Sequence, residues 1–468
     1  MNKVKVGLAC IGLDTYWKQF DGLLDRLLSG NGIIKEKLEK YGAEVVDVGM
    51  IDTPFKASLA VDMLHGVELL FVYISTYALS STVLPIAKGI KSRVILLNVQ
   101  PSAAINYNYI NSLDDRGKMT GEWLANCQVC SLPEIASVFR RTGVAFSVIT
   151  GHMEQKEVWS EIKEWVMAVS AVYGMRHNNL AVLGHYYCGM LDVYTDLTRQ
   201  CGVFGTHIEL VEMCELKKFW DGVNQNDIKA KIAQFENEFT IDSRCSKHEL
   251  IRAAKTSVAL DRLVEKHNIG SMAYYYEGED DYQDIVTSII AGNTLLTSKG
   301  IPIAGECEVK NAQAMKIFSL MGAGGSFSEF YGLDFNDDVV MLGHDGPTHI
   351  SIAQGNAELV PLPIYHGKPG SGLSIQMSVK HGDVTILSVC EDTQDIYLLV
   401  AEGKSVKGPV LNIGNTNSRY KFSIGAKEFI NAWSESGPSH HCAIGVGHLG
   451  TTIEKFGSLL GIKTIKIC

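Results

Sequence analysis

The sequence predicts an α/β protein with two tandem Rossmann-like α/β domains followed by an antiparallel β-barrel-like C-terminal domain. Short β-rich runs alternate with helical segments through about the first 320 residues, which is typical of parallel sheets covered by helices. After about residue 325 strands dominate, and turn signals separate them at roughly ten-residue intervals. A length of 468 residues fits about three domains of ~150 residues. We expect domains at 1–175, 176–322 and 323–468.

The first domain shows five β-rich runs with periodic segments between them. The helix expected over Asp21–Gly42 is the clearest, because its apolar residues recur at three and four positions and a glycine ends it. Residues 151–173 read as a long amphipathic helix that suits a link between domains. The expected strands are Val4–Cys10, Glu44–Val48, Leu69–Ser75, Val94–Val99 and Ala145–Thr150.

Loops at the carboxyl ends of parallel strands are where ligands bind in such sheets. Tyr16 and Trp17 lie in the loop after the first strand, where they either line a pocket or cap the sheet. No GxGxxG motif follows that strand, which argues against a dinucleotide site.

The second and third domains differ in the secondary structure that we expect, with both strands and helices in the second and mainly strands in the third. For the second, we expect strands at Leu180–Leu183, His207–Val211 and Met272–Tyr276, and helices at Met190–Cys201, Ile228–Phe239, Glu249–His267 and Tyr282–Leu295. For the third, we expect strands at Val339–Leu342, Leu359–Ile364, Leu373–Val379, Thr385–Val389, Ile396–Glu402 and Val410–Ile413. Seven of the 14 histidines fall in the last 125 residues, so the third domain concentrates the imidazoles.

Composition excludes several classes of partner. A net charge of −10 argues against nucleic acid, which needs a basic face. No apolar run approaches the ~20 residues of a membrane span, and no cleavage site follows the apolar start. Eleven scattered cysteines, an odd number, indicate reduced thiols in the cytoplasm. Cys127 and Cys130 form one CxxC without the second pair that a structural zinc site needs, so a metal or redox role ranks below a structural one.

Two carboxylates at the junction between the second and third domains are candidates for chemistry. Glu306 follows a short apolar run, and Glu329 follows the glycine-rich segment 322–326, which reads as a flexible turn. His344 ends a predicted strand. Each of these alone is typical of a solvated loop or a structural position. Together with a histidine from the C-terminus they form a set of oxygen and imidazole donors that suits Mn²⁺, Fe²⁺, Co²⁺ or Zn²⁺, and the carboxylates favour Mn²⁺.

The C-terminal pair His440 and His441 follows Gly437 and Pro438, residues that supply a turn. Neighbouring residues of an extended segment point to opposite sides, so both imidazoles can face one point only if the backbone turns there. We therefore expect His441 and His440 on opposite sides of one turn, one imidazole binding a metal and the other facing a substrate. The alternative is a polar loop with two solvated histidines.

Four segments resemble the metal-site segments of L-arabinose isomerases in order and approximate spacing: Ala304–Lys310, Gly325–Tyr331, Leu342–His344 and Pro438–His441. Residues 148–156 resemble a further segment of that family. The resemblance implies isomerisation of an aldose to its 2-ketose with Mn²⁺ or a similar divalent ion such as Co²⁺, in a homo-oligomer that is a hexamer in the family.

Carried over by position, the resemblance implies the roles of individual residues. The metal ligands would be Glu306, Glu329, His344 and His441, while His440, Met190 and Tyr276 would contact the sugar, with Tyr16 and Trp17 as further candidates. Glu306 and Glu329 would pass a carbon-bound proton through an enediol, and a hydride shift would need the same ligands.

The sequence departs from the family where the far end of the sugar is held. Residues 124–134 lack the histidine of the family's corresponding segment, and Leu13–Trp17 replaces a Ser-Gln-His type of turn. We therefore expect the reaction class to hold on a free pentose or hexose that need not be L-arabinose.

Three alternatives remain open. A sugar epimerase would share the same metal ligands. A non-catalytic sugar-binding protein also fits two tandem α/β domains, but it predicts a signal peptide and leaves the histidines of the third domain without a purpose. A purely structural metal site would be closed by four protein ligands.

Overall fold

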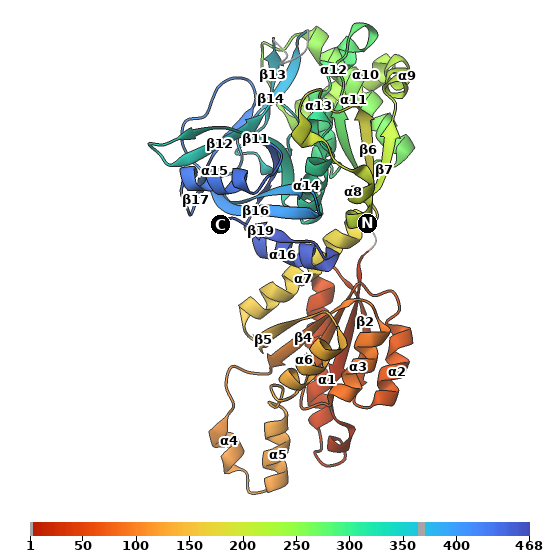
Figure 1. The fold of residues 1–468 in the computed structure, drawn as a ribbon, viewed down its shortest axis with the longest axis vertical. Helices are drawn as coiled ribbons and strands as arrows, with labels where there is room; N and C mark the ends of the chain where they lie inside the picture. The colour runs from red at the N-terminus through yellow and green to blue at the C-terminus, as the bar shows by residue number, and fades with distance from the viewer. Residues whose placement is uncertain (1–2, 364–369) are drawn as a thin grey trace. The chain divides into compact units, whose positions relative to one another are not determined.

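The computed structural model describes residues 3–363 and 370–468, and the chain divides into two compact units, Met1–Tyr173 and Gly174–Cys468 (Figure 1). Two parallel sheets and an antiparallel barrel confirm the predicted fold class. The three domain boundaries expected from the sequence stay predictions. Within the described ranges, no helix is long and apolar enough to cross a membrane.

The first unit is a five-stranded parallel sheet in the order β2-β1-β3-β4-β5. The interiors of its central strands are fully buried, which explains their unbroken apolar sequences. All five predicted strands are confirmed: β1 (Lys5–Ile11), β2 (Glu44–Ile51), β3 (Leu69–Ile74), β4 (Arg93–Gln100) and β5 (Phe146–His152). The helices are α1 (Leu23–Lys40), α2 (Pro54–Met63), α3 (Ser80–Gly89), α4 (Tyr107–Ser112), α5 (Arg116–Leu124) and α6 (Ser131–Thr142). Helices α4 and α5 contact each other as a pair (Figure 1).

The long helix expected over 151–173 is α7 (Lys156–Arg176). It begins later than predicted because Gly151 and His152 still pair with β4 as the end of β5.

The second unit begins with a parallel sheet in the order β10-β9-β6-β7. Gly184 pairs with Tyr275, so the loops after β6 and β9 begin at the same edge of the sheet. The strands are β6 (Asn179–Gly184), β7 (His207–Val211), β9 (Ser271–Tyr275) and β10 (Ile303–Ala304). The helices are α8 (Leu197–Phe204), α9 (Met213–Asp221), α10 (Gln225–Glu238), α11 (Lys247–His267), α12 (Gln283–Val286), α13 (Ile290–Ser298) and α14 (Val309–Leu320).

Two predicted helices of this region are interrupted. The segment 190–201 is a short 3₁₀ turn at Leu191–Val193 followed by α8, which starts only after Asp196. The carboxylate of Asp196 accepts a hydrogen bond from the backbone N–H of Arg199 at 3.1 Å and so caps α8 at this point. The segment 282–295 is likewise divided, between α12 and α13.

Six antiparallel strands then close into a barrel in the order β15-β18-β11-β12-β17-β16, because β16 pairs with β15. Closure leaves no free sheet edge among these six strands. The barrel strands are β11 (Gly324–Asp334), β12 (Val339–His344), β15 (Gly382–Glu391), β16 (Ile396–Val406), β17 (Thr416–Phe422) and β18 (His441–Val446). The remaining elements are β19 (Thr464–Lys466) alongside β16, a small sheet of β8 (Thr240–Ile241), β13 (Glu358–Leu362) and β14 (Gly372–Gln376), and helices α15 (Ala426–Glu435) and α16 (Gly450–Leu460).

Two expectations for the barrel were wrong, and one lies partly outside the described residues. The segment 322–326 is not a flexible turn, because β11 begins at Gly324 and a Cβ on Gly325 would lie 2.6 Å from the carbonyl oxygen of Met315. Gly325 thus allows α14 to pack closely against this strand. The segment 410–413 is not a strand, and the neighbouring strand begins at Thr416. Ile364, the last residue of the strand expected at 359–364, lies outside the described residues.

Gly184 lies at the sheet edge where the loops after β6 and β9 begin, and a substitution at this residue tests the packing of that edge. Its φ is 97°, and a Cβ there would lie 1.9 Å from the carbonyl oxygen of Tyr275. Gly184→Ala should therefore lower the free energy of unfolding by about 1–3 kcal/mol, measured by urea denaturation. Gly202 lies inside α8, where a Cβ meets nothing within 4 Å. Gly202→Ala should therefore raise the free energy of unfolding by up to ~1 kcal/mol. Equal effects of the two substitutions would contradict the packing described here.

Candidate metal centre

The pairing register of the barrel strands places three predicted site residues next to one another, namely Glu329, His344 and His441. Strands β12, β11 and β18 are neighbours, and Glu329 on β11 pairs with Gly343 on β12 and with His441 on β18. His344 directly follows Gly343 at the end of its strand. Strand pairing alone thus places one carboxylate beside two imidazoles.

Glu306 arrives from the neighbouring parallel sheet, in a tight turn directly after β10. Glu306 and Cys307 both adopt left-handed backbone conformations, with φ of 55° and 60°. Residues other than glycine rarely adopt this conformation, and it persists where the surrounding structure enforces it. Here α14 follows at once and packs against β11 and β18, which holds the turn against the barrel.

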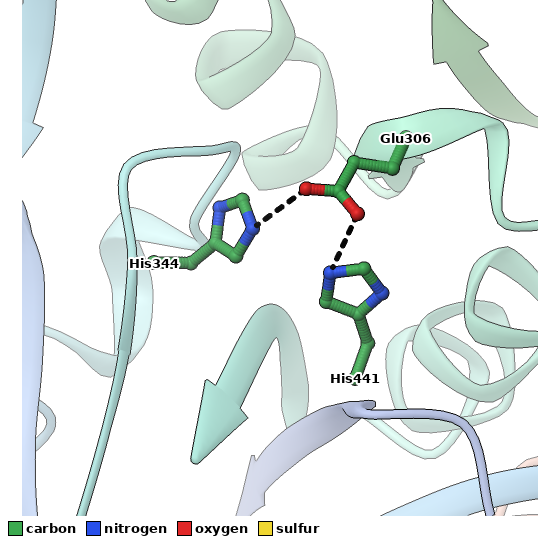
Figure 2. A group of neighbouring side chains, drawn as sticks. All are labelled: Glu306, His344 and His441. Atoms are coloured by element: carbon green, nitrogen blue, oxygen red, sulfur yellow. Dashed lines mark ion pairs between the residues drawn. The ribbon is translucent and has the colours of Figure 1, made fainter. Parts of the chain in front are cut away.

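The carboxylate of Glu306 lies between two imidazoles (Figure 2). Its Oε1 is 3.9 Å from Nε2 of His344, and its Oε2 is 3.3 Å from Nε2 of His441. These three side chains, and separately Glu329, His440 and His441, offer donor atoms that lie within 4.8 Å of one another. The four predicted ligands and His440 therefore converge.

The donor set fits a divalent ion. Oε2 of Glu306 and Nε2 of His441 are buried and make no hydrogen bond within residues 3–363 and 370–468. Leaving a buried polar group unpaired costs about 1–3 kcal/mol, so both atoms call for a partner. Carboxylate oxygen combined with imidazole nitrogen suits Mn²⁺ and related ions.

His441 is held in the orientation that a metal ligand requires. Its Nδ1 donates to Oε2 of Glu308 at 2.6 Å, and Glu308 is itself fully buried and accepts a hydrogen bond from the hydroxyl of Ser439. The ring of Phe327 packs on the imidazole with centroids 4.3 Å apart. These contacts fix the tautomer and leave the lone pair of Nε2 directed at Glu306.

His344 is buried, and burial lowers the pKa of its imidazole, which favours the neutral form that binds metals. The backbone N–H of Gly346 donates to its Nδ1 at 2.7 Å, which places the proton of the neutral ring on Nε2. Metal binding through Nε2 requires the other tautomer. In that tautomer Nδ1 carries the proton, and Oδ1 of Asp345, which lies 3.3 Å from Nδ1, can accept it in a hydrogen bond.

The two carboxylates experience different surroundings. Burial raises the pKa of Glu306, but the imidazoles of His440, His441 and His344 outweigh it, and the net shift is downward. For Glu329 burial dominates, and its pKa is raised. Glu306 is thus the more strongly ionised carboxylate of the pair.

His440 and His441 do not lie on opposite sides of a turn, contrary to the prediction. Their ring centroids are 3.8 Å apart, and Nε2 of His440 lies 3.5 Å from Oε2 of Glu306 and 4.0 Å from Oε2 of Glu329. The extended-segment argument fails because His440 precedes β18 rather than lying within it.

Asp192 determines the position of His440. Its Oδ2 accepts hydrogen bonds from the backbone N–H and from Nδ1 of His440, at 3.0 and 2.6 Å. The ammonium of the buried Lys310 donates to the backbone carbonyl of Asp192 at 2.5 Å. Glu306 first, and then Asp192, raise the pKa of His440 to about 9.

A cavity of about 240 Å³ opens on Glu306, Glu329 and His344. Met190 lines it, and its contact with a sugar stays a prediction. Tyr276 is not among the described residues that line it, since its ring packs against His185 and Tyr282. The wall also contains Tyr187, Tyr274, Tyr275, Val286, Ile289, Ile290 and Asn293.

Tyr16 and Trp17 belong to the first unit. The indole Nε1 of Trp17 donates to Oδ2 of Asp52 at 2.8 Å, and the ring of Tyr16 packs edge-on against Trp17 and Phe20. Contact of Tyr16, Trp17 or Tyr276 with a sugar stays a prediction.

Sequence reasoning missed three residues of the site. Glu308 stands two positions after Glu306 and was visible as a second carboxylate, but nothing in the sequence linked it to His441. Asp192 and Asn293 gave no signal, because only folding brings them beside site residues that are remote in the sequence. Oδ1 of Asn293 is a buried atom of the cavity wall with no hydrogen bond among the described residues.

Comparisons with known proteins place the second unit of the chain in a family. The family model of the L-arabinose isomerase central domain matches residues 196–324, and that of the L-arabinose isomerase C-terminal domain matches residues 324–463. The L-arabinose isomerase of Aeromonas salmonicida (strain A449) is 21% identical over 334 residues, covering 69% of this chain and 66% of that protein. The L-arabinose isomerase of Shewanella baltica (strain OS223) is 22% identical over 399 residues, covering 78% and 73%. The chain thus spans about two thirds of the length of the first of these relatives.

The contact between Glu308 and His441 predicts a metal-affinity effect. Glu308→Gln keeps the size of the side chain but removes the charge that orients the imidazole, so the affinity for Mn²⁺ should fall by roughly 10–100-fold. Titration calorimetry with Mn²⁺ measures this directly. The exposed Glu358 provides a matched control, since Glu358→Gln should leave the affinity unchanged. Unchanged affinity in Glu308→Gln would show that Glu308 does not orient a ligand.

Proposed function

The chain belongs to the L-arabinose isomerase family, and from that membership we propose that it is a metal-dependent aldose-ketose isomerase acting on a free pentose or hexose. The observation that supports this most strongly is the convergence of Glu306, Glu329, His344 and His441, with buried donor atoms that lack partners. An aldose and its 2-ketose differ only in hydrogens on C1, C2 and their oxygens, so the reaction needs proton carriers beside a site for the two oxygens.

The ligands of the ion would be Glu306, Glu329, His344 and His441. The two carboxylates favour Mn²⁺, with Co²⁺ as the alternative. When bound, such an ion polarises a carbonyl and stabilises negative charge that develops on its oxygen.

The carboxylates supply the proton chemistry. Glu306 and Glu329 face the same cavity, so one accepts the proton from C2 of the aldose as O1 gains a proton, which gives the enediol, and a proton then returns to C1 as O2 loses its own. Nε2 of His440 lies within 4.0 Å of an oxygen of each carboxylate and places the imidazole beside both proton carriers. Asp192 keeps that nitrogen turned toward the carboxylates by holding Nδ1 on the opposite edge of the ring.

The cavity wall selects the sugar. Met190 and the aromatic and aliphatic side chains around it offer apolar surface, and Oδ1 of Asn293 offers an acceptor for a sugar hydroxyl. The altered segments 124–134 and 13–17 support a preferred sugar other than L-arabinose.

Two further properties complete the proposal. The family resemblance supports a homo-oligomer, with a hexamer as the expected form. All eleven cysteines are free thiols, which supports a reducing compartment, the cytoplasm.

A panel of pentoses and hexoses with added Mn²⁺ tests the function. We expect one or a few aldoses to yield the 2-ketose, identified by NMR of the product, with L-arabinose not the preferred substrate. Glu329→Gln should lower kcat by about 10²–10⁴-fold, because it removes a proton carrier.

The outcomes of this panel are distinguishable. Strong, selective turnover of L-arabinose would contradict the altered specificity and leave the isomerase intact. A C2 epimer as product would identify an epimerase. No turnover of any sugar would contradict catalysis of this class.

A further inference from the structure

The CxxC of the first unit takes no part in the proposed isomerisation, and its two sulfur atoms are unusually close. Sγ of Cys127 and Sγ of Cys130 lie 2.9 Å apart, and both residues are free thiols. A disulfide bond is ~2.05 Å long, so an approach of less than ~1 Å would allow the bond to form. Among the described residues, no third metal-ligating side chain joins this pair in a candidate metal group, which argues against a metal site.

Hydrogen bonds hold the loop that carries the two cysteines on the side of Cys127. Gln128 is fully buried, and its amide donates to the backbone carbonyls of Ser75 and Ala125, at 3.0 and 2.9 Å. The hydroxyl of Thr76 donates to the carbonyl of Leu124 at 2.7 Å. These bonds join the loop to the end of β3 and hold Cys127 in place.

Hydrogen bonds also hold the loop on the side of Cys130. The hydroxyl of Ser131, directly after Cys130, accepts a hydrogen bond from the backbone N–H of Ala78 at 2.7 Å, and the carboxylate of Glu134 accepts one from the backbone N–H of Ser80 at 2.8 Å. The short distance between the sulfurs is therefore set by the fold on both sides.

The two thiols differ in a way that suits thiol–disulfide exchange. Cys130 is exposed and stands at the N-terminus of the twelve-residue helix α6. Cys127 is buried beneath it, and burial first, and then the neighbouring Cys130, raise its pKa to about 12. One sulfur is thus accessible to a reagent, and the other is shielded but within reach of the first.

We propose that Cys127 and Cys130 form a redox-active dithiol that closes reversibly into an intramolecular disulfide by exchange with a low-molecular-weight disulfide. The thiolate of Cys130 attacks one sulfur of that disulfide, forming a mixed disulfide and releasing one small thiol. Cys127 then loses its proton and attacks the sulfur of Cys130, releasing the second small thiol. The two protein thiols are oxidised, the small disulfide is reduced, and the two protons pass to the released thiols.

Glutathione provides the probe. The reduced full-length chain is equilibrated at a series of ratios of oxidised to reduced glutathione, blocked with an alkylating reagent and digested for mass spectrometry. We expect the peptide containing both cysteines to lose two hydrogens and to carry neither glutathione nor the blocking group, and dithiothreitol to reverse this. The exposed Cys188 and Cys214 report ordinary glutathione adducts in the same samples.

A variant separates the two steps. In Cys127→Ser, Cys130 has no resolving thiol and should retain glutathione. Glutathione retained on Cys130 of the wild-type chain with Cys127 alkylated, or alkylation of both cysteines at every ratio, would overturn the proposal. Neither readout involves sugar turnover or metal, so the result is independent of the proposed isomerase function.

Discussion

The approach of the Glu306 carboxylate to the imidazoles of His344 and His441 is the contact on which the site depends. The carboxylate comes from the end of a parallel sheet, whereas both imidazoles come from barrel strands, so neither layer holds the centre alone. A left-handed turn at Glu306 and Cys307, uncommon for such residues, makes the meeting possible, and α14 packs the turn against the barrel. A partly buried carboxylate facing buried imidazoles is costly unless it is charge-paired or binds an ion, which explains why so many polar groups surround it.

The supporting contacts are as specific as the ligands. Glu308 sets the tautomer of His441, Asp192 turns His440 toward both carboxylates, and Lys310 anchors the backbone of Asp192. Each of these contacts joins segments more than 100 positions apart in the chain. The geometry of the centre is therefore a property of the packing of the whole second unit.

Periodicity was sufficient for the parallel sheets, because buried parallel strands such as β3 read as continuous apolar runs between turn signals. It also found β12, which ends at His344, but it missed β11 and β18, the strands of Glu329 and His441. The glycines at 324 and 325 resemble a turn in sequence, yet they begin β11, and Gly325 packs closely against α14 in the strand that carries Glu329. The ligand types could be recognised from residues such as Glu306 and His441, but the orienting residue Asp192 could not, since its contact with His440 exists only in the folded chain.

The most direct test of the account is the metal content of the purified protein after loading with Mn²⁺ and removal of free ion. The wild-type chain should retain a stoichiometric amount of Mn²⁺, whereas Glu306→Gln and His441→Ala, with unchanged circular dichroism, should lose it. His448→Ala is a matched control, because that imidazole contacts the carbonyl of Gly403, outside the centre, and its metal content should stay at the wild-type level. Wild-type metal content in both Glu306→Gln and His441→Ala would contradict the proposed centre and the isomerase mechanism built on it.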